Sequence, residues 1–375
     1  MSSLRELFDA EGLSPWLDNL KRPYLTGGRL AELVGDGVRG LTSNPTIMAK
    51  AIEGGDAYDE QFRQCMARGD DAEAAYWDLV VADVVGALEV FSPLHQRSDG
   101  TDGFVSIEVA PDLARSTGRT VESARSLHDR IQRPNLLVKI PATAEGVPAI
   151  RQMISEGRSI NVTLIFSIER YEEVMEAYLS GLETFVEGGG DPSKVASVAS
   201  FFVSRVDTEV DRRLEAVAAA SPERGERAHR LLGTIAVSQA RLAYSHFEAR
   251  FSGPRWESLA AAGARVQRPL WASTSTKNPH YADLLYVESL IGRNCVNTMP
   301  EDTIEKFIDH GRIERTIGRD LSGATAGLAD LADLGVDLAD VAATLEDEGV
   351  AAFEKSFAEV LDRLRDKAVS LGSER

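Results

Sequence analysis

Apolar residues recur along the chain in short runs, and longer stretches with helical spacing separate these runs. A short apolar run bounded by turn residues is typical of a buried strand, whereas apolar residues three and four positions apart indicate a helix. The predicted strands are residues 15–20, 37–41, 103–109, 136–141, 159–166, 195–204, 266–272 and 294–299. Eight strands that alternate with helices predict an α/β fold, a (β/α)8 or TIM barrel.

Several predicted helices lie outside the regular alternation. One helix over residues 3–10 precedes the first strand, an insertion over about 45–92 contains two helical segments, and a helical extension covers about 301–375. No change of composition marks a linker, so we expect residues 1–375 to form one domain. Two doubly wound domains are the alternative, but no glycine-rich phosphate-binding motif follows any strand. The amphipathic segment 350–371 would cover the barrel mouth or contact a neighbouring subunit.

Charge and composition exclude several classes of protein. The net charge of −18 argues against a nucleic-acid partner, which requires a clustered basic face. No apolar stretch is long enough for a transmembrane helix, and the charged N-terminal segment does not look like a secretory signal, so we expect a cytoplasmic protein without a membrane partner. The two cysteines and six histidines form no metal-binding motif, and no metal site is expected.

Lys139 lies inside the apolar run 136–141. Burial disfavours an ammonium group and lowers the pKa of lysine, which leaves free amine for attack on a carbonyl. The alternative is a strand end from which the side chain simply reaches water.

Polar residues also occur at or near the carboxyl ends of the other predicted strands. They are Asp18, Asn44, Glu108, Asn161, Thr163, Ser200, Arg205 and the loop from Ser273 to Lys277. Each has a structural explanation by itself; Asn44 before Pro45, for example, is a typical helix start. In a barrel, however, the carboxyl ends of all strands meet at the mouth, where barrel enzymes have their active sites.

This set of side chains predicts Schiff-base chemistry. The amine of Lys139 would attack a ketone and form an iminium, which stabilises a carbanion on the neighbouring carbon. Asp18 or Glu108 would take the proton from the departing hydroxyl, and Thr163 would hold a water for a second acid–base step. Arg205, with Lys277 as a second cation, would bind a phosphate or carboxylate end of the substrate.

Six segments, in this order, resemble the motifs of the transaldolase family. They are WLD at 16–18, LTSNPT at 41–46, SIEV at 106–109, VKIPAT at 138–143, NVTLIFS at 161–167 and SFFVSR at 200–205. The resemblance extends over roughly residues 15–300, and the helical tail is also similar to that of the family. The complete set is specific, although each motif alone is not.

The resemblance implies a cofactor-free class I Schiff-base transferase of the non-oxidative pentose phosphate pathway. Such an enzyme transfers a dihydroxyacetone unit from sedoheptulose 7-phosphate to glyceraldehyde 3-phosphate, giving erythrose 4-phosphate and fructose 6-phosphate. By motif position, Lys139 is the Schiff-base lysine and Asp18 the acid–base group. Glu108 and Thr163 would hold the catalytic water. The implied substrate-binding residues are Thr42, Asn44, Asn161, Ser200, Arg205, Ser273 and Lys277.

The sequence departs from the family in one place. Many members have a second phosphate-binding arginine soon after the seventh strand, where this chain has Lys277, a cation without the bidentate guanidinium fork. The pattern resembles the longer-chain branch, which includes fusions to phosphoglucose isomerase; the present length predicts the single activity.

Three questions stay open at the level of the sequence. A fructose 6-phosphate aldolase would use the same lysine and the same barrel, and the sequence separates the two activities poorly. A non-catalytic barrel is the other alternative, although it would leave the polar strand-end residues without a role. Both a monomer and a homodimer are compatible with the sequence.

Overall fold

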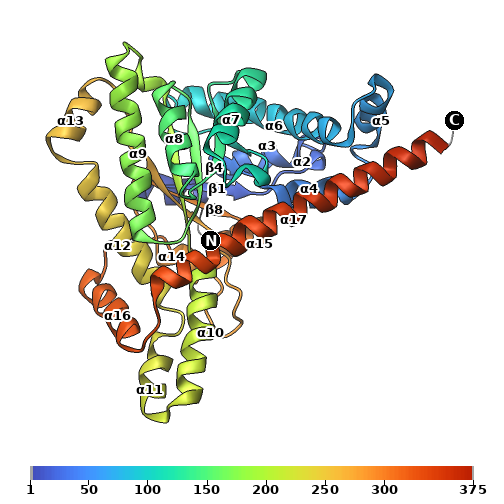
Figure 1. Cartoon of the computed structure of the whole chain (residues 1–375). Helices are drawn as coiled ribbons and strands as arrows, with labels where there is room; N and C mark the ends of the chain where they lie inside the picture. Colours follow the sequence, from blue (N-terminus) through green and yellow to red (C-terminus); the bar gives the residue numbers. More distant parts are fainter. Residues whose placement is uncertain (1–2, 374–375) are drawn as a thin grey trace.

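The computed structural model describes residues 3–373, and its centre is a closed barrel of eight parallel strands in sequence order (Figure 1). The strands are β1 (Leu13–Asp18), β2 (Gly40–Thr42), β3 (Phe104–Glu108), β4 (Leu136–Pro141), β5 (Ile160–Ile165), β6 (Ser197–Phe202), β7 (Arg268–Ala272) and β8 (Cys295–Met299). The pairing of β8 with β1 closes the barrel. The predicted (β/α)8 fold is confirmed.

The strand register brings the polar strand ends together. Asp18 pairs with Thr42 between β1 and β2, and Lys139 pairs with Glu108 of β3 on one side and with Asn161 of β5 on the other. In a parallel barrel these paired positions lie at the same level. The carboxyl ends of five strands therefore present their polar side chains to a single mouth.

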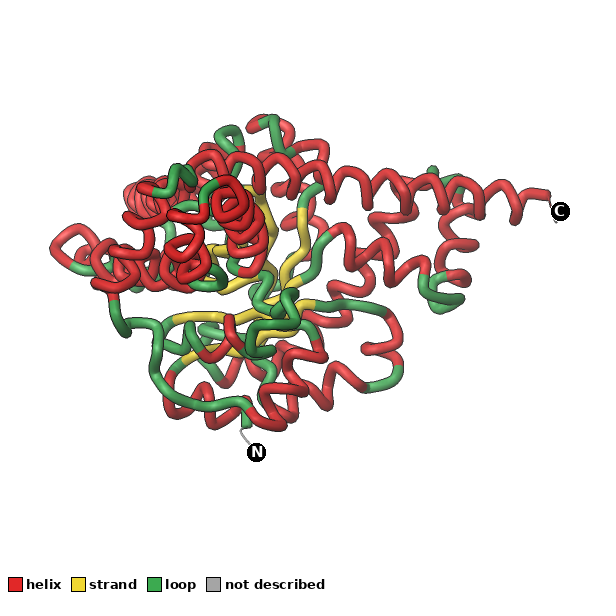
Figure 2. The backbone as a smooth tube through the Cα atoms, turned by 90° about the horizontal axis from the view of Figure 1, so that it is seen from below, coloured by secondary structure: helices red, strands yellow, loops and turns green. Residues whose placement is uncertain are grey.

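Helices surround the barrel, as the tube in Figure 2 shows. Before β3 lie α1 (Leu4–Glu11), α2 (Arg22–Thr26), α3 (Arg29–Asp36), α4 (Pro45–Glu53), α5 (Asp59–Arg68) and α6 (Ala72–Arg97). Between β3 and β7 lie α7 (Thr117–Ile131), α8 (Gly146–Ser155), α9 (Ile168–Glu187), α10 (Ser204–Ala220), α11 (Pro222–Leu231), α12 (Ile235–Arg250) and α13 (Gly253–Ala261). The rest are α14 (Leu285–Glu288), α15 (Glu301–His310), α16 (Leu321–Asp333) and α17 (Leu338–Ser373).

Several predicted boundaries differ from the structure. The first strand ends at Asp18 and does not continue to residue 20, and the insertion contains three helices, α4, α5 and α6, instead of two. The apolar spacing of residues 281–291 predicts a helix, but the structure has only the short α14 there. The hydroxyl of Thr276 donates hydrogen bonds to the carbonyl oxygens of Ala282 and Asp283, at 2.9 and 3.1 Å. In a regular helix these two carbonyl oxygens would accept hydrogen bonds from backbone amides, whereas here they accept them from the Thr276 side chain.

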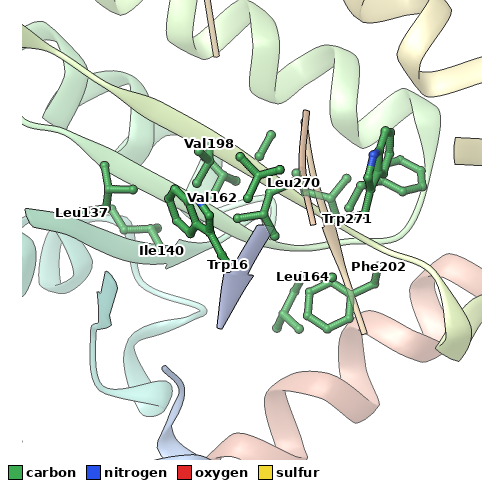
Figure 3. Close-up of a cluster of buried hydrophobic side chains, with 14 of the residues drawn as sticks. Trp16, Leu137, Ile140, Val162, Leu164, Val198, Phe202, Leu270 and Trp271 are labelled. Carbon is green, nitrogen blue, oxygen red and sulfur yellow. The ribbon is translucent and has the colours of Figure 1, made fainter. Parts of the chain in front are cut away.

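The core inside and around the barrel is mainly apolar. Figure 3 shows buried side chains from several strands in this cluster, among them Trp16, Leu137 and Leu270. All three are fully buried. They fill the barrel beneath the polar mouth, as is usual for this fold. Within residues 3–373, no helix is both long and apolar enough to cross a bilayer.

The last helix, α17, packs across the carboxyl end of the barrel and extends beyond it (Figures 1 and 2). It contacts α4, α6, α10 and β5. Phe353 and Phe357 of this helix are buried, and Phe357 packs edge-on against Tyr76 of α6, with ring centroids 5.1 Å apart. The sequence left two locations open for segment 350–371, the barrel mouth and a neighbouring subunit. In the structure this segment covers the barrel mouth.

Candidate active site

Lys139 extends from β4 into the interior of the barrel mouth. Its amine lies 3.2 Å from Oε2 of Glu108, and the two side chains are only 7% and 3% exposed. Nζ also donates a hydrogen bond of 3.1 Å to the backbone oxygen of Ser43, which follows β2. The alternative in which Lys139 reaches bulk water is therefore wrong. The amine is held by groups from two other strand ends.

Burial determines the behaviour of the two carboxyl groups near Lys139. Loss of hydration raises the pKa of Glu108 above its usual value, and the charge of Lys139 opposes part of this effect. The pKa of Asp18 is also raised by burial, against the charge of Lys139 and the hydrogen bond from Thr42. Buried carboxyls with raised pKa values, next to a buried amine, are typical of sites that transfer protons.

Asp18 ends β1 and is positioned by hydroxyl groups. The hydroxyl of Thr42 donates a hydrogen bond of 2.7 Å to Asp18 Oδ1. Thr42 also lies 2.6 Å from the hydroxyl of Thr298, at the end of β8. Three neighbouring strands thus hold the carboxyl at the mouth.

A chain of hydrogen bonds joins β3, β5 and β6 inside the barrel, beside Lys139. Asn161 of β5 donates to the hydroxyl of Ser106 at 2.9 Å and accepts a hydrogen bond of 2.8 Å from Ser200 of β6. All three residues are buried. Thr163 lies two residues after Asn161, and its buried hydroxyl has no hydrogen-bond partner within residues 3–373. That hydroxyl is free to bind a group in the mouth.

Asn44 has the structural role that the sequence predicted. Its side-chain oxygen accepts a hydrogen bond of 3.0 Å from the amide of Ile47 and so caps α4, with Pro45 at the first helical position. Asn44 is partly buried and also faces the mouth cavity. The capping hydrogen bond therefore holds Asn44 at the edge of the cavity. Its structural role is compatible with a place in the site.

Arg205 lies in the first turn of α10, directly after β6, and does not belong to the strand. Its guanidinium packs over the ring of Phe202, 5.2 Å from the ring centroid. Burial lowers the pKa of Arg205, and the carboxylates of Asp18, Glu348 and Glu108 oppose this shift. A partly buried guanidinium without a paired carboxylate within residues 3–373 can bind an anionic ligand.

The loop after β7 contributes weaker groups. The hydroxyl of Ser273 lies 2.9 Å from that of Ser204. Lys277 is exposed, and its amine donates a hydrogen bond of 2.6 Å to Ser275. Lys277 is therefore an exposed point charge at the cavity, whereas Arg205 is partly buried.

These side chains meet in one cavity of about 400 Å³ at the carboxyl end of the barrel. Nine of the eleven residues predicted for the site line it: Asp18, Thr42, Asn44, Lys139, Thr163, Ser200, Arg205, Ser273 and Lys277. Glu108 and Asn161 do not line the cavity themselves. Glu108 contacts the lining residue Lys139, and Asn161 accepts a hydrogen bond from the lining residue Ser200. The structure therefore brings the whole predicted set together.

Other lining residues were not predicted, and three of them bear on the site. Thr298 contacts Thr42, Lys50 follows the predicted motif on α4, and Phe353 reaches the cavity from α17. Thr298 had a signal in the sequence, because it is a polar residue one position before the end of an apolar run. Phe353 had none, since its place in an apolar helical stripe does not show what the stripe covers.

Comparison with known proteins gives a consistent result. Residues 15–364 match the model of a family described as Transaldolase/Fructose-6-phosphate aldolase. A protein named transaldolase from Thermobifida fusca is 50% identical over 365 residues, which cover 97% of each chain. Another from Mycolicibacterium smegmatis is 50% identical over 94% of each chain, and one from Frankia alni is 46% identical over 100% of each.

Proposed function

The chain belongs to the transaldolase/fructose-6-phosphate aldolase family, and from this membership we infer that it is a transaldolase, a transferase that moves a ketone-bearing unit between sugar phosphates. We propose the reaction in which dihydroxyacetone passes from sedoheptulose 7-phosphate to glyceraldehyde 3-phosphate through a Schiff base on Lys139. The observation that supports this residue is its buried amine, 3.2 Å from a carboxyl group inside the cavity.

The first step requires an uncharged amine. A proton that moves from Nζ of Lys139 to Oε2 of Glu108 crosses 3.2 Å, and the raised pKa of Glu108 favours the protonated acid. The lone pair of Nζ then attacks the ketone carbon, a carbon–nitrogen bond forms, and the carbonyl oxygen takes a proton to give a carbinolamine.

Loss of water from the carbinolamine gives the iminium. Glu108 can donate the proton that leaves with the hydroxyl, and the unpartnered hydroxyl of Thr163 can bind the departing water. The same two groups would return the water when the product is released by hydrolysis. We therefore assign acid–base chemistry at the carbon–nitrogen bond to Glu108 and Thr163.

Asp18 acts at the carbon–carbon bond. Its carboxylate takes the proton from the hydroxyl next to the breaking bond, the aldehyde product departs, and the electron pair moves into the iminium to form an enamine. The acceptor aldehyde is then attacked by the enamine carbon, and Asp18 returns the proton to the new hydroxyl. The hydrogen bond from Thr42 holds Asp18 Oδ1 in place during both steps.

The remaining groups bind the substrate. Asn44, Asn161 and Ser200 would bind the hydroxyl groups of the dihydroxyacetone unit, and Arg205 would bind the phosphate with its guanidinium fork. Thr42, Ser273 and Lys277 complete the lining. No step requires a cofactor. We also propose that the protein acts in the cytoplasm, in the non-oxidative pentose phosphate pathway.

Borohydride trapping tests the proposal. Incubation with fructose 6-phosphate, reduction with sodium borohydride and peptide mass mapping should show a reduced dihydroxyacetone adduct on Lys139. The Lys139→Ala variant should fold and show neither adduct nor turnover. An adduct on another lysine, or turnover by this variant, would overturn the assignment.

A second assay separates transfer from simple aldol cleavage. The protein is incubated with fructose 6-phosphate alone and with an added acceptor aldehyde, and free dihydroxyacetone is measured. Release that depends on no acceptor would indicate an aldolase; little release without the acceptor, and rapid transfer with it, supports the transaldolase.

A further inference from the structure

A second cavity lies at the opposite end of the barrel from Lys139. Its lining comes from the residues that precede or begin the strands, such as Gly12 before β1, Phe104 in β3 and Ser197 in β6. Its volume is about 400 Å³, the same as that of the active-site cavity. A cavity of this size can hold a small metabolite. The proposed reaction does not use it.

Cationic side chains dominate the charge in this cavity. Arg265, Arg268 and Arg293 all line it, together with Asp9 and Asp102. Asp102 is fully buried and is shared by two guanidinium groups, because Arg268 Nη1 lies 3.1 Å from Oδ1 and Arg39 Nε lies 2.6 Å from Oδ2. One carboxylate cannot neutralise two cations, so this cluster keeps a positive charge.

The other two arginines have weak or no carboxylate partners. Arg265 lies 3.9 Å from Asp99, whose side chain is fully exposed, and such an ion pair is largely screened by water. Arg293 forms no ion pair within residues 3–373. Asp9 is exposed at the rim. In a protein of net charge −18, a cavity with three arginines and so little compensation is a local positive site.

Two glycines leave room for the side chains of Arg293 and Arg265 at the cavity. Gly12 and Gly100 both have left-handed backbone conformations, with φ of 72° and 69°. A Cβ atom on Gly12 would lie 3.3 Å from Cγ of Arg293, and one on Gly100 would lie 3.1 Å from Nη1 of Arg265. Both arginine side chains thus pack against bare backbone at the cavity edge.

Most of the remaining lining is apolar, and Thr101, Ser197 and Asn294 add polar groups. Phe8, Phe104 and Val266 form part of the wall, and the ring of Phe8 lies 3.4 Å from Cζ of Arg39. An apolar wall beside several guanidinium groups fits a ligand with an anionic group and a carbon body. Inorganic phosphate alone would use only the cationic part.

We propose that this cavity, named here the lower cavity, is a second anion site that binds a small phosphate monoester through Arg265, Arg268 and Arg293. The site is separate from the proposed catalytic site and does not depend on it. Its ligand binds at the amino ends of the strands whose carboxyl ends hold Lys139 and Ser200.

Calorimetric titration with phenyl phosphate tests the proposal. The titrations use the full chain with Arg205→Gln and Lys277→Gln, because these changes remove the two cations proposed to bind phosphate in the catalytic cavity. We expect about one equivalent of phenyl phosphate to bind, and inorganic phosphate to bind more weakly. Adding Arg265→Gln and Arg293→Gln should raise the Kd at least about tenfold, since contacts to charged groups are lost.

The matched control adds Arg227→Gln and Arg230→Gln on α11, which remove the same charge at positions that do not line the cavity; Arg227 is partly exposed and Arg230 is exposed. This control should leave the Kd unchanged. Loss of all binding with Arg205→Gln and Lys277→Gln, equal weakening by both arginine pairs, or equal affinity for the two anions would overturn the proposal.

A tungstate soak of wild-type crystals gives an independent measurement that does not depend on the variants. Density against Arg265, Arg268 and Arg293 supports the proposal, and density confined to the cavity of Arg205 contradicts it.

Discussion

Lys139 and Glu108 form a buried ion pair across the neighbouring strands β4 and β3, with Nζ and Oε2 3.2 Å apart. A buried pair of this kind costs hydration energy on both sides, and apolar residues of similar size would often be at least as stable. The pair is therefore better explained by proton transfer between its members than by a contribution to folding.

Replacement of Lys139 by methionine should abolish turnover and leave the fold intact. The amine is the nucleophile in the proposed reaction, so we expect kcat to fall by on the order of 10³-fold or more. Glu108 can become neutral by taking up a proton, because burial already raises its pKa. Coupled assay of transfer and circular dichroism check the two parts. Lys306→Met, on the exposed face of α15, should keep full activity.

The activity should fall on the acidic side of the pH profile with an apparent pKa above that of an ordinary aspartate. Burial raises the pKa of Asp18, and the carboxylate form must take the proton from the substrate hydroxyl. Protonation of Asp18 as pH decreases therefore removes the base. Asp18→Asn should lower kcat by about 10²- to 10⁴-fold at every pH. Steady-state rates from pH 4 to 9 check both expectations, and an unchanged acid limb in this variant would contradict the role of Asp18.

Arg205→Gln should raise the KM for fructose 6-phosphate by about 10- to 100-fold, because charge-assisted contacts to the phosphate are lost. Lys277→Gln should have a smaller effect, since this lysine is exposed and bonded only to Ser275. Rates with fructose, which has no phosphate, are the control and should change little in either variant. Equal effects of the two variants would mean that Lys277 fully takes the place of a second phosphate-binding arginine.

Asp207 should make the stability of the protein depend on pH. Burial raises its pKa to about 7, although the Ala236 amide and the Tyr286 hydroxyl donate hydrogen bonds to it at 2.7 and 2.9 Å. Because the folded state holds the proton more tightly than the unfolded state, stability is lost as pH rises from about 4 to about 7.

In Asp207→Asn this loss should be absent. The free energy of unfolding of the variant, relative to wild type, should therefore increase across that interval by up to about 4 kcal/mol. Urea unfolding at pH 4 and pH 8 measures the change. A difference between variant and wild type that is independent of pH would contradict the raised pKa.

Gly349→Leu should displace α17 from the barrel mouth. A Cβ atom at this position would already lie 3.0 Å from Cδ2 of Leu164 and 3.8 Å from Nη1 of Arg205, so a larger side chain cannot fit without movement. We expect a loss of about 1 to 3 kcal/mol in stability, a raised KM for phosphorylated ketoses and more release of free dihydroxyacetone. Gly118→Leu on α7 is the control, because no atom lies within 4 Å of its Cβ position.

Most of the fold could be predicted from the sequence, because apolar residues recur with different periods in strands and in helices. The buried faces of the barrel strands and the surrounding helices keep these periods. The sequence also indicated the site, since Asp18, Glu108 and Lys139 interrupt apolar runs at positions where a polar residue is costly. The loop over 281–291 was misassigned because its apolar spacing is helical, whereas the hydrogen bonds from Thr276 are visible only in three dimensions. The roles of the site residues and the assignment of residues 1–375 to one domain stay predictions.

The position of α17 over the barrel mouth has a consequence during protein synthesis. Phe353 and Gly349 follow all eight strands in the chain, so the ribosome releases the complete barrel before it releases the helix that closes over it. In the nascent chain, the segments that carry Lys139 and its neighbours are therefore outside the ribosome before the helix that shields them from water.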